Sequence, residues 1–178
     1  STPLAQIPIL IKIVIFYLLY DFGSYWVHRL MHTPLIWSTH VWHHLPTEIW
    51  CLSGARASIW HVFFYRLAFL PFFFFLFPPT IGLIIAIEII LYNSWMHMNL
   101  KWYSWMRYLE WVIVTPRFHH LHHGSSEAFH NINYGAQFTI WDRLFHTFVS
   151  PDDVDPKTLE FGVNGGEKVS IVRAAIGI

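Results

Sequence analysis

Three long apolar stretches dominate the first hundred residues of the chain. They cover residues 7–27, 57–77 and 81–97. Each has close to the roughly 20 residues that a helix needs to cross about 30 Å of hydrocarbon. Few charged residues interrupt these stretches: Lys12, Asp21, Arg66 and Glu88. The pattern predicts an all-α, integral membrane helical bundle with about three membrane helices.

The link between the second and third stretches fixes the expected topology. Residues 77–80 read FPPT, and two consecutive prolines cannot continue a helix. So short a link allows only a helical hairpin. The end of the first stretch near His28 and the end of the third near His97 should therefore lie on the same side of the membrane. All the histidine clusters are expected on that side, as a helical cap.

Composition supports a membrane protein and excludes some other classes. Apolar residues make up 54% of the chain and charged residues 12%, whereas soluble domains carry about 25% charged residues. The formal net charge is zero, so nothing indicates a nucleic acid partner. Cys51 is the only cysteine, which excludes an intrachain disulfide and a cysteine-based zinc site.

The positive charges predict an orientation. Nine of the eleven Lys and Arg residues lie on the histidine side or in the tail: Arg29, Arg56, Lys101, Arg107, Arg117, Arg143, Lys157, Lys168 and Arg173. By the positive-inside rule, the histidine side is cytoplasmic. Residues 101–114, with several tryptophans and two cations, suggest a helix lying in the membrane interface. We expect a catalytic domain over residues 1–149 and a polar tail over 150–178.

The histidines are the candidate functional residues. The chain has thirteen, and their spacing is regular. HRLMH places two at i and i+4, whereas HVWHH and the end of FHHLHH place three at i, i+3 and i+4, on one side of a helix. One more ends the third apolar stretch. These nine are the predicted metal ligands: His28, His32, His40, His43, His44, His97, His119, His122 and His123.

Nine imidazoles are too many for one metal ion but suit two ions with four or five nitrogen ligands each. Imidazole is a ligand for zinc, copper, iron and nickel. Neutral imidazoles leave the metal charge unbalanced, so supporting carboxylates are expected; the candidates are Asp21, Glu48, Glu127 and Asp142. Further candidates for a supporting role around the ligands are His61, His120, His130 and Asn133.

Three other functions fit the sequence less well than a two-metal histidine site. A membrane zinc hydrolase would need an HExxH-like motif, which is absent. A non-enzymatic haem-binding electron carrier would place single histidines deep in facing membrane helices, and only His61 lies near such a place. A metal transporter or store would need ionisable residues along a path at mid-membrane, where only Arg66 and Glu88 qualify. The non-enzymatic membrane metal- or haem-binding protein is kept as the alternative.

The three histidine motifs resemble those of the fatty acid hydroxylase/sterol desaturase superfamily. Its pattern HxxxH, HxxHH, HxxHH is matched by the quoted clusters, over roughly residues 21–148. The segments EWVIVTPRFHHLHHG and NINYGAQFTIWDRLFHTF are similar to its C-terminal signature. Asn131, His146 and His120 depart from the usual residues, which puts the subfamily and the substrate in doubt. Members commonly have a further upstream membrane segment, which suggests a trimmed chain.

The resemblance implies an integral-membrane, non-haem di-iron oxidoreductase. Two Fe²⁺ ions would reduce and split O₂ and remove hydrogen from a C–H bond of a lipid, such as a sterol, fatty acyl chain or ether lipid, by hydroxylation or desaturation. Zinc could replace iron in purified protein. Electrons would come from an external donor, a cytochrome b5-like protein or a ferredoxin with its reductase. The membrane would be the bacterial inner membrane or the endoplasmic reticulum.

Overall fold

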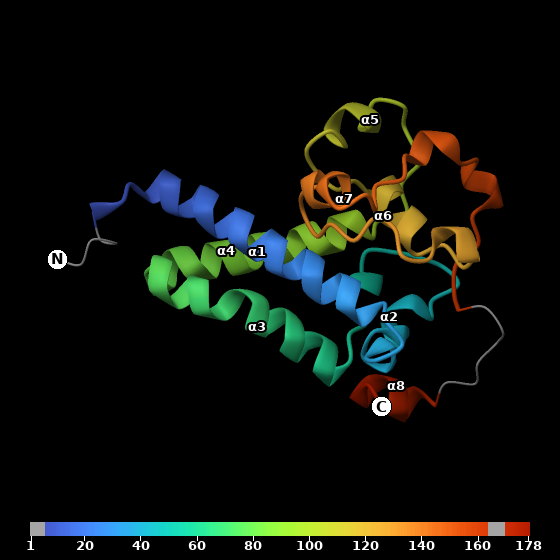
Figure 1. Cartoon of the computed structure of the whole chain (residues 1–178), viewed down its shortest axis with the longest axis horizontal. Coiled ribbons are helices and arrows are strands. Elements are labelled where there is room, and N and C mark those ends of the chain that lie inside the picture. The colour runs from blue at the N-terminus through green and yellow to red at the C-terminus, as the bar shows by residue number, and fades with distance from the viewer. Residues whose placement is uncertain (1–5, 164–169) are drawn as a thin grey trace.

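The structure is a computed structural model that describes residues 6–163 and 170–178. Three long helices, α1 (Ile9–Met31), α3 (Ile59–Leu76) and α4 (Pro79–Met96), extend to one side of the molecule, and the shorter elements gather at their other end (Figure 1). The described residues contain no strand, only two isolated β-bridges. The predicted all-α bundle with a histidine-rich helical cap is confirmed. The short helices are α2 (Val41–His44), α5 (Met106–Leu109), α6 (Pro116–His122), α7 (Ile140–Leu144) and α8 (Ile171–Ile176).

The helix boundaries follow from local sequence. The Ser58 hydroxyl accepts a hydrogen bond from the backbone N–H of His61, which caps the beginning of α3. Phe77 and Pro78 adopt extended backbone and form the expected hairpin turn, and Pro79 is the first residue of α4. The first helix extends to Met31, beyond the apolar stretch that ends at residue 27; His28 lies within it, and His32 is the residue at its C-terminal cap.

An aromatic cluster joins the three long helices. Phe16 of α1 is fully buried and contacts the ring of Phe77 edge-on, at 5.4 Å between centroids. The Tyr20 ring stacks parallel to that of Phe16, and Ile85 of α4 completes the cluster. This packing joins the far ends of the helices, so that their other ends can diverge around the histidine-rich cap (Figure 1).

Two of the described helices, α1 and α4, are long and apolar enough to cross a membrane. A core helix of a soluble protein would pass the same test, but it would be mostly buried. Here only 28% and 17% of the most apolar windows of α1 and α4 are buried. Leucine and isoleucine side chains stand exposed on both helices, which supports membrane association.

The predicted interfacial helix over residues 101–114 is wrong in extent. Only Met106–Leu109 is helical. Ile113 instead forms an isolated β-bridge with Phe138, and the Val114 N–H donates to the carbonyl of Gln137. These backbone groups pair with a distant loop, which removes them from any helix. Trp105 and Trp111 remain exposed, at 51% and 69%.

The described part of the segment expected as a polar tail packs against the rest of the protein. The guanidinium of Arg117 in α6 forms an ion pair with Asp152 at 2.6 Å, and Phe161 forms a β-bridge with Gly124. Helix α8 lies against α2 and α3. The Ser38 hydroxyl donates to the carbonyl of Gly177, next to the cap of α3. Lys168, one of the predicted tail cations, lies outside the described residues.

Candidate metal centre

The histidine motifs all lie at helix ends in the cap. His28 belongs to the last turn of α1, and His32 follows its end. His40 precedes α2, which contains His43 and His44. The third motif lies on α6, whose first turn is capped by the hydroxyl of Thr115, and His123 ends that helix. His97 follows the last residue of α4.

The nine predicted ligands meet in two adjacent groups. In each group, one ring nitrogen from every histidine lies within 4.8 Å of the others. The five-histidine cluster consists of His28, His32, His40, His44 and His122. The four-histidine cluster consists of His43, His97, His119 and His123. All nine side chains except His32 are buried.

Each HxxHH motif is divided between the two clusters in the same way. Its first and last histidines, such as His40 and His44, belong to one cluster, and the middle one, His43, belongs to the other. At about 100° per residue, positions i and i+4 are only about 40° apart around the helix, whereas i+3 and i+4 are about 100° apart. The i+3 side chain therefore reaches a neighbouring site. The motifs thus bridge the two clusters.

Backbone carbonyls hold the rings in one tautomer. The Nδ1 atom of His97 lies 2.7 Å from the carbonyl oxygen of Asn93, and that of His43 lies 3.2 Å from the carbonyl oxygen of Arg56. In the five-histidine cluster, His28 and His122 face the carbonyl oxygens of Tyr134 and Ile132 in the same way, both at 2.8 Å. A carbonyl only accepts, so each Nδ1 carries the proton and each Nε2 keeps a lone pair.

These lone pairs face one another. The Nε2 atoms of His43 and His97 are 3.2 Å apart, and the Nδ1 atoms of both rings face carbonyl oxygens. Two nitrogens whose protons are both committed elsewhere cannot hydrogen-bond to each other. A shared cation would turn this repulsive contact into an attractive one. Two nitrogens that each lie about 2.1 Å from one ion, at an angle near 100°, are about 3.2 Å apart.

Electrostatics favour the neutral, metal-binding form of the rings. Burial, reinforced by the neighbouring imidazoles, lowers the pKa of His43, His44, His119 and His123 well below the ordinary histidine value. Burial is the main cause of the lowered pKa of His122 as well. The donor set therefore consists of uncharged nitrogens, and it fits two ions of a metal that binds imidazole.

Two of the expected carboxylates support the histidine rings indirectly, through the backbone of a loop. Asp142 accepts hydrogen bonds from the backbone N–H groups of Tyr134 and Gly135, both at 2.7 Å, and burial raises its pKa to about 6. Asp21 of α1 accepts from the N–H groups of Gln137 and Phe138. Both hold the loop at 131–138, which supplies carbonyls to His28 and His122.

Two of the four candidate carboxylates do not lie at the histidine clusters. Glu48 and Glu127 are exposed and belong to neither histidine group. Carboxylates were expected beside the imidazoles, but main-chain carbonyl oxygens accept the Nδ1 hydrogen bonds of His28, His43, His97 and His122. Hydrogen bonding by main-chain carbonyls has no residue-type signature, so the sequence could not identify this support.

The remaining candidate residues take different positions. The His61 Nδ1 atom lies 3.0 Å from the Nδ1 atom of His40, so His61 contacts a cluster member directly. The Asn133 side chain donates to the carbonyl of Val149 and accepts from its N–H, which fixes the 131–138 loop. His120 is buried with its ring against Phe161, outside both clusters. His130 is exposed and belongs to neither cluster; its backbone N–H donates to the carbonyl of Glu127.

A buried ion pair behind α6 was not anticipated. Glu110 and Arg117 form two hydrogen bonds, each 2.7 Å long, and both side chains are almost fully buried. Glu110 also accepts a hydrogen bond from the cap residue Thr115. The pair fixes the first turn of α6, which carries His119. A charged residue within the apolar run before the third motif was the available signal.

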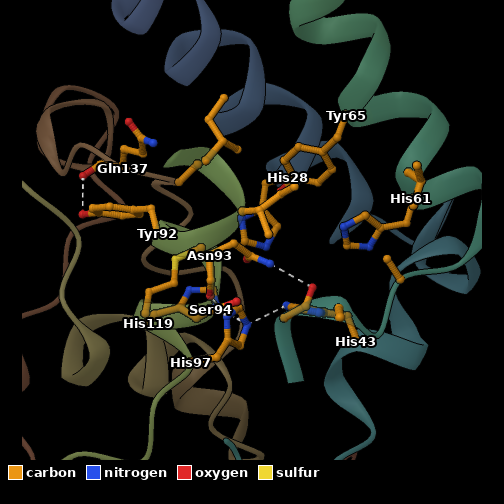
Figure 2. A pocket seen from close by; sticks show the side chains of 18 of the residues that line it. His28, His43, His61, Tyr65, Tyr92, Asn93, Ser94, His97, His119 and Gln137 are labelled. Carbon is orange, nitrogen blue, oxygen red and sulfur yellow. Dashed lines mark hydrogen bonds between the residues drawn. The ribbon is translucent and has the colours of Figure 1, made fainter. Parts of the chain in front are cut away.

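A cavity of about 290 Å³ adjoins the clusters (Figure 2). His28, His43, His97 and His119 lie on its wall. Helices α1, α3 and α4 and two loops line the rest, with apolar side chains such as Val62, Ala86 and Ile89 beside polar ones such as Tyr65, Arg66 and Asn93. The cavity therefore connects both histidine groups with the apolar part of the molecule.

Comparison with known proteins agrees with this geometry. The sequence profile described as "Fatty acid hydroxylase" matches residues 13–147. Alkylglycerol monooxygenase of Xenopus tropicalis is 33% identical over 72% of this chain and 28% of its own. Ornithine lipid hydroxylase of Rhizobium tropici is 29% identical over 90% of this chain and 48% of its own. A probable Delta(7)-sterol 5(6)-desaturase of Neurospora crassa is 32% identical over 78% and 38%.

The chain spans less than half the length of these relatives. No solved structure matches. The matched region nevertheless includes all nine clustered histidines, the 131–138 loop and the long helices, and it covers three quarters of the chain. The chain therefore belongs to the fatty acid hydroxylase family.

Proposed function

We propose that this protein is a membrane oxidoreductase that uses two iron ions and O₂ to hydroxylate or desaturate a C–H bond of a lipid. The observation that carries the proposal is the pair of buried histidine clusters with their lone pairs turned inward. The named relatives, two lipid hydroxylases or monooxygenases and a sterol desaturase, support the class of reaction.

Each cluster would hold one ion, with five nitrogens for one and four for the other. The bound iron would supply O₂ reduction with two external electrons and two protons: hydroxylation would leave one oxygen atom in the lipid and release the other as water, and desaturation would release both as water. The protein residues fix the geometry. The carbonyls of Tyr134 and Ile132 orient His28 and His122 through their Nδ1 protons.

The lipid would enter from the bilayer into the cavity between the long helices, whose apolar walls exclude water from the reacting carbon. We place the cap on the cytoplasmic side, where an external electron donor such as a cytochrome b5-like protein or a ferredoxin can reach it. The membrane would be the bacterial inner membrane or the endoplasmic reticulum, according to the host.

Metal analysis of detergent-purified protein tests the proposal first. We expect about two metal ions per chain, iron when the cells are supplied with it, and zinc as a substitute when they are not. His43→Ala and His122→Ala, one in each cluster, should each lose metal and abolish turnover. His146→Asn is the control, because His146 is exposed, belongs to neither histidine cluster, and has a left-handed backbone that Asn tolerates.

Product analysis tests the reaction itself. Iron-loaded protein in lipid, with a chemical reductant and isotopically labelled O₂, should give a lipid alcohol carrying the label or a new alkene. Full activity in either alanine variant would refute the ligand assignment. One haem per chain would favour the non-enzymatic alternative instead, and near-zero metal would refute the assignment of the histidines as metal ligands.

A further inference from the structure

His61 contacts a cluster histidine through its ring and also lines the cavity. It lies in the first turn of α3, and Ser58 positions this turn by donating from its hydroxyl to the carbonyl of Thr39 at 2.5 Å. Thr39 directly precedes His40, so the same contact brings the His61 ring next to the His40 ring. Figure 2 shows His61 and Tyr65 extending from α3 toward the histidines of the other elements.

The contact between the two rings determines where their protons lie. The Nδ1 atoms of His40 and His61 are 3.0 Å apart. On the proposed function, the Nε2 atom of His40 binds an ion and must keep its lone pair, so the His40 proton is on Nδ1. His61 must then accept that proton's hydrogen bond with its own Nδ1 lone pair. Its remaining proton is therefore on Nε2, on the opposite side of the ring.

That Nε2–H group borders the cavity. His61 is among the lining residues, and within residues 6–163 and 170–178 its Nε2 makes no hydrogen bond. The ring of Tyr65 stacks on it, with centroids 5.0 Å apart and planes 24° apart, which holds the imidazole plane. The cavity is lined by apolar residues such as Ala57, Val62 and Ala86 and by polar ones such as Arg66 and Asn93. A donor without a partner at such a wall gains from an acceptor that a ligand brings.

We propose that the His61 Nε2–H group binds an oxygen atom of the lipid substrate, and that the substrate class is a lipid with an ether, hydroxyl or acyl oxygen close to the oxidised carbon. The His61 ring lies 4.8 Å from that of His40 and 5.5 Å from that of His43, one from each cluster. An oxygen held there would place the adjoining carbon next to both ions. A plain methylene in the middle of an acyl chain offers no such acceptor.

This inference rests on the proposed function, and two His61 variants separate the two roles of the ring. An Asn side chain can keep an oxygen near the Nδ1 position to accept from His40, but it has no group at the Nε2 position. A Gln side chain can place an N–H group near the Nε2 position, but it has no acceptor near the Nδ1 position for the hydrogen bond from His40. His61→Asn should therefore change lipid binding, and His61→Gln should weaken metal retention.

The test measures binding to zinc-loaded protein in lipid nanodiscs, where no turnover consumes the probe. Radiolabelled hexadecyl methyl ether and octadecane differ only by an oxygen in place of a methylene. After correction for partition into empty nanodiscs, wild-type protein should prefer the ether by about fivefold, the effect of one hydrogen bond. His61→Asn should retain zinc and lose most of this preference. His61→Gln should keep part of it and lose zinc more readily to a chelator. His146→Asn should match wild type.

Several outcomes would overturn the inference. If wild-type protein bound both probes equally, no group in the cavity would bind the ether oxygen, and the proposed role of the His61 Nε2–H group would be excluded without any variant. An unchanged ether preference in His61→Asn with two zinc ions per chain would show that another group, such as the Tyr65 hydroxyl, holds the oxygen. Zinc content in the same samples shows whether the proposed function itself fails. Wild-type protein without metal would refute that function, and with it the assignment of the His61 proton to Nε2.

Discussion

At the scale of single residues, the centre depends on where each imidazole proton lies. Residue type and spacing identify His28, His43, His97 and His122 as ligand candidates. They do not show that main-chain carbonyls accept hydrogen bonds from all four Nδ1–H groups. Those carbonyls belong to distant parts of the chain or to the backbone of the same helix. The sequence could therefore predict the donor atoms as a set but not their orientation.

The buried ion pair beside α6 gives a prediction at this scale. Arg117→Met would leave the Glu110 carboxylate buried without its charged partner. Breaking a buried pair in this way costs roughly 3 kcal/mol. We expect the free energy of unfolding to fall by about that amount, measured by thermal unfolding in detergent. Arg107→Met is the matched control, since Arg107 is fully exposed. Equal midpoints for the two variants would show that the pair contributes no net stability.

At the scale of elements, the loop at 131–138 joins α1, α6 and α7. Asp21 from α1 and Asp142 from α7 hold four of its backbone N–H groups, and its carbonyls hold His28 and His122. Asn131 and Asn133 supply the left-handed backbone that the loop requires, with φ of 64° and 54°. Asn133 and Asp142 could be named from the sequence as candidates that support the metal ligands. That they act through the backbone of the loop could not be predicted.

Gly135 provides the test of this loop. A Cβ atom there would lie 2.5 Å from the carbonyl oxygen of Phe138 and 2.9 Å from Oδ2 of Asp142. A backbone oxygen cannot move without displacing the loop, so Gly135→Ala should shift the carbonyls that hold His28 and His122. We expect about one metal ion to be lost per chain, preferentially from the five-histidine cluster, by elemental analysis. Full metal content in a folded Gly135→Ala protein would contradict the role of the loop.

At the scale of the whole molecule, the hairpin of α3 and α4 brings His61 and His97 back to the end of α1 that carries His28. The apolar stretches predicted this arrangement, because FPPT allows only a tight turn. The extent of the helix over 101–114 was wrong, since non-local pairing with residues 137 and 138 outweighed local helical propensity.

The orientation in the membrane can be tested with the single cysteine. Cys51 lies in the cap between α2 and α3 and is partly exposed, whereas Thr80 is exposed at the tip of the hairpin. In a bacterial host, an impermeant maleimide should label Cys51 in inside-out vesicles but not in intact cells. A Cys51→Ser protein that carries Thr80→Cys should show the reverse. Labelling of Cys51 in intact cells would place the cap on the outer side.

The sequence by itself determined the apolar helices, the hairpin and the nine histidines, because these depend on residue type and on spacing within a few turns. Only the tertiary structure decided how the histidines divide into five and four, which carbonyls hold their protons, and how His61 meets His40. The physical reason is distance along the chain. A helix sets the angles between its own side chains, but the pairing of groups from different helices depends on how the whole bundle packs.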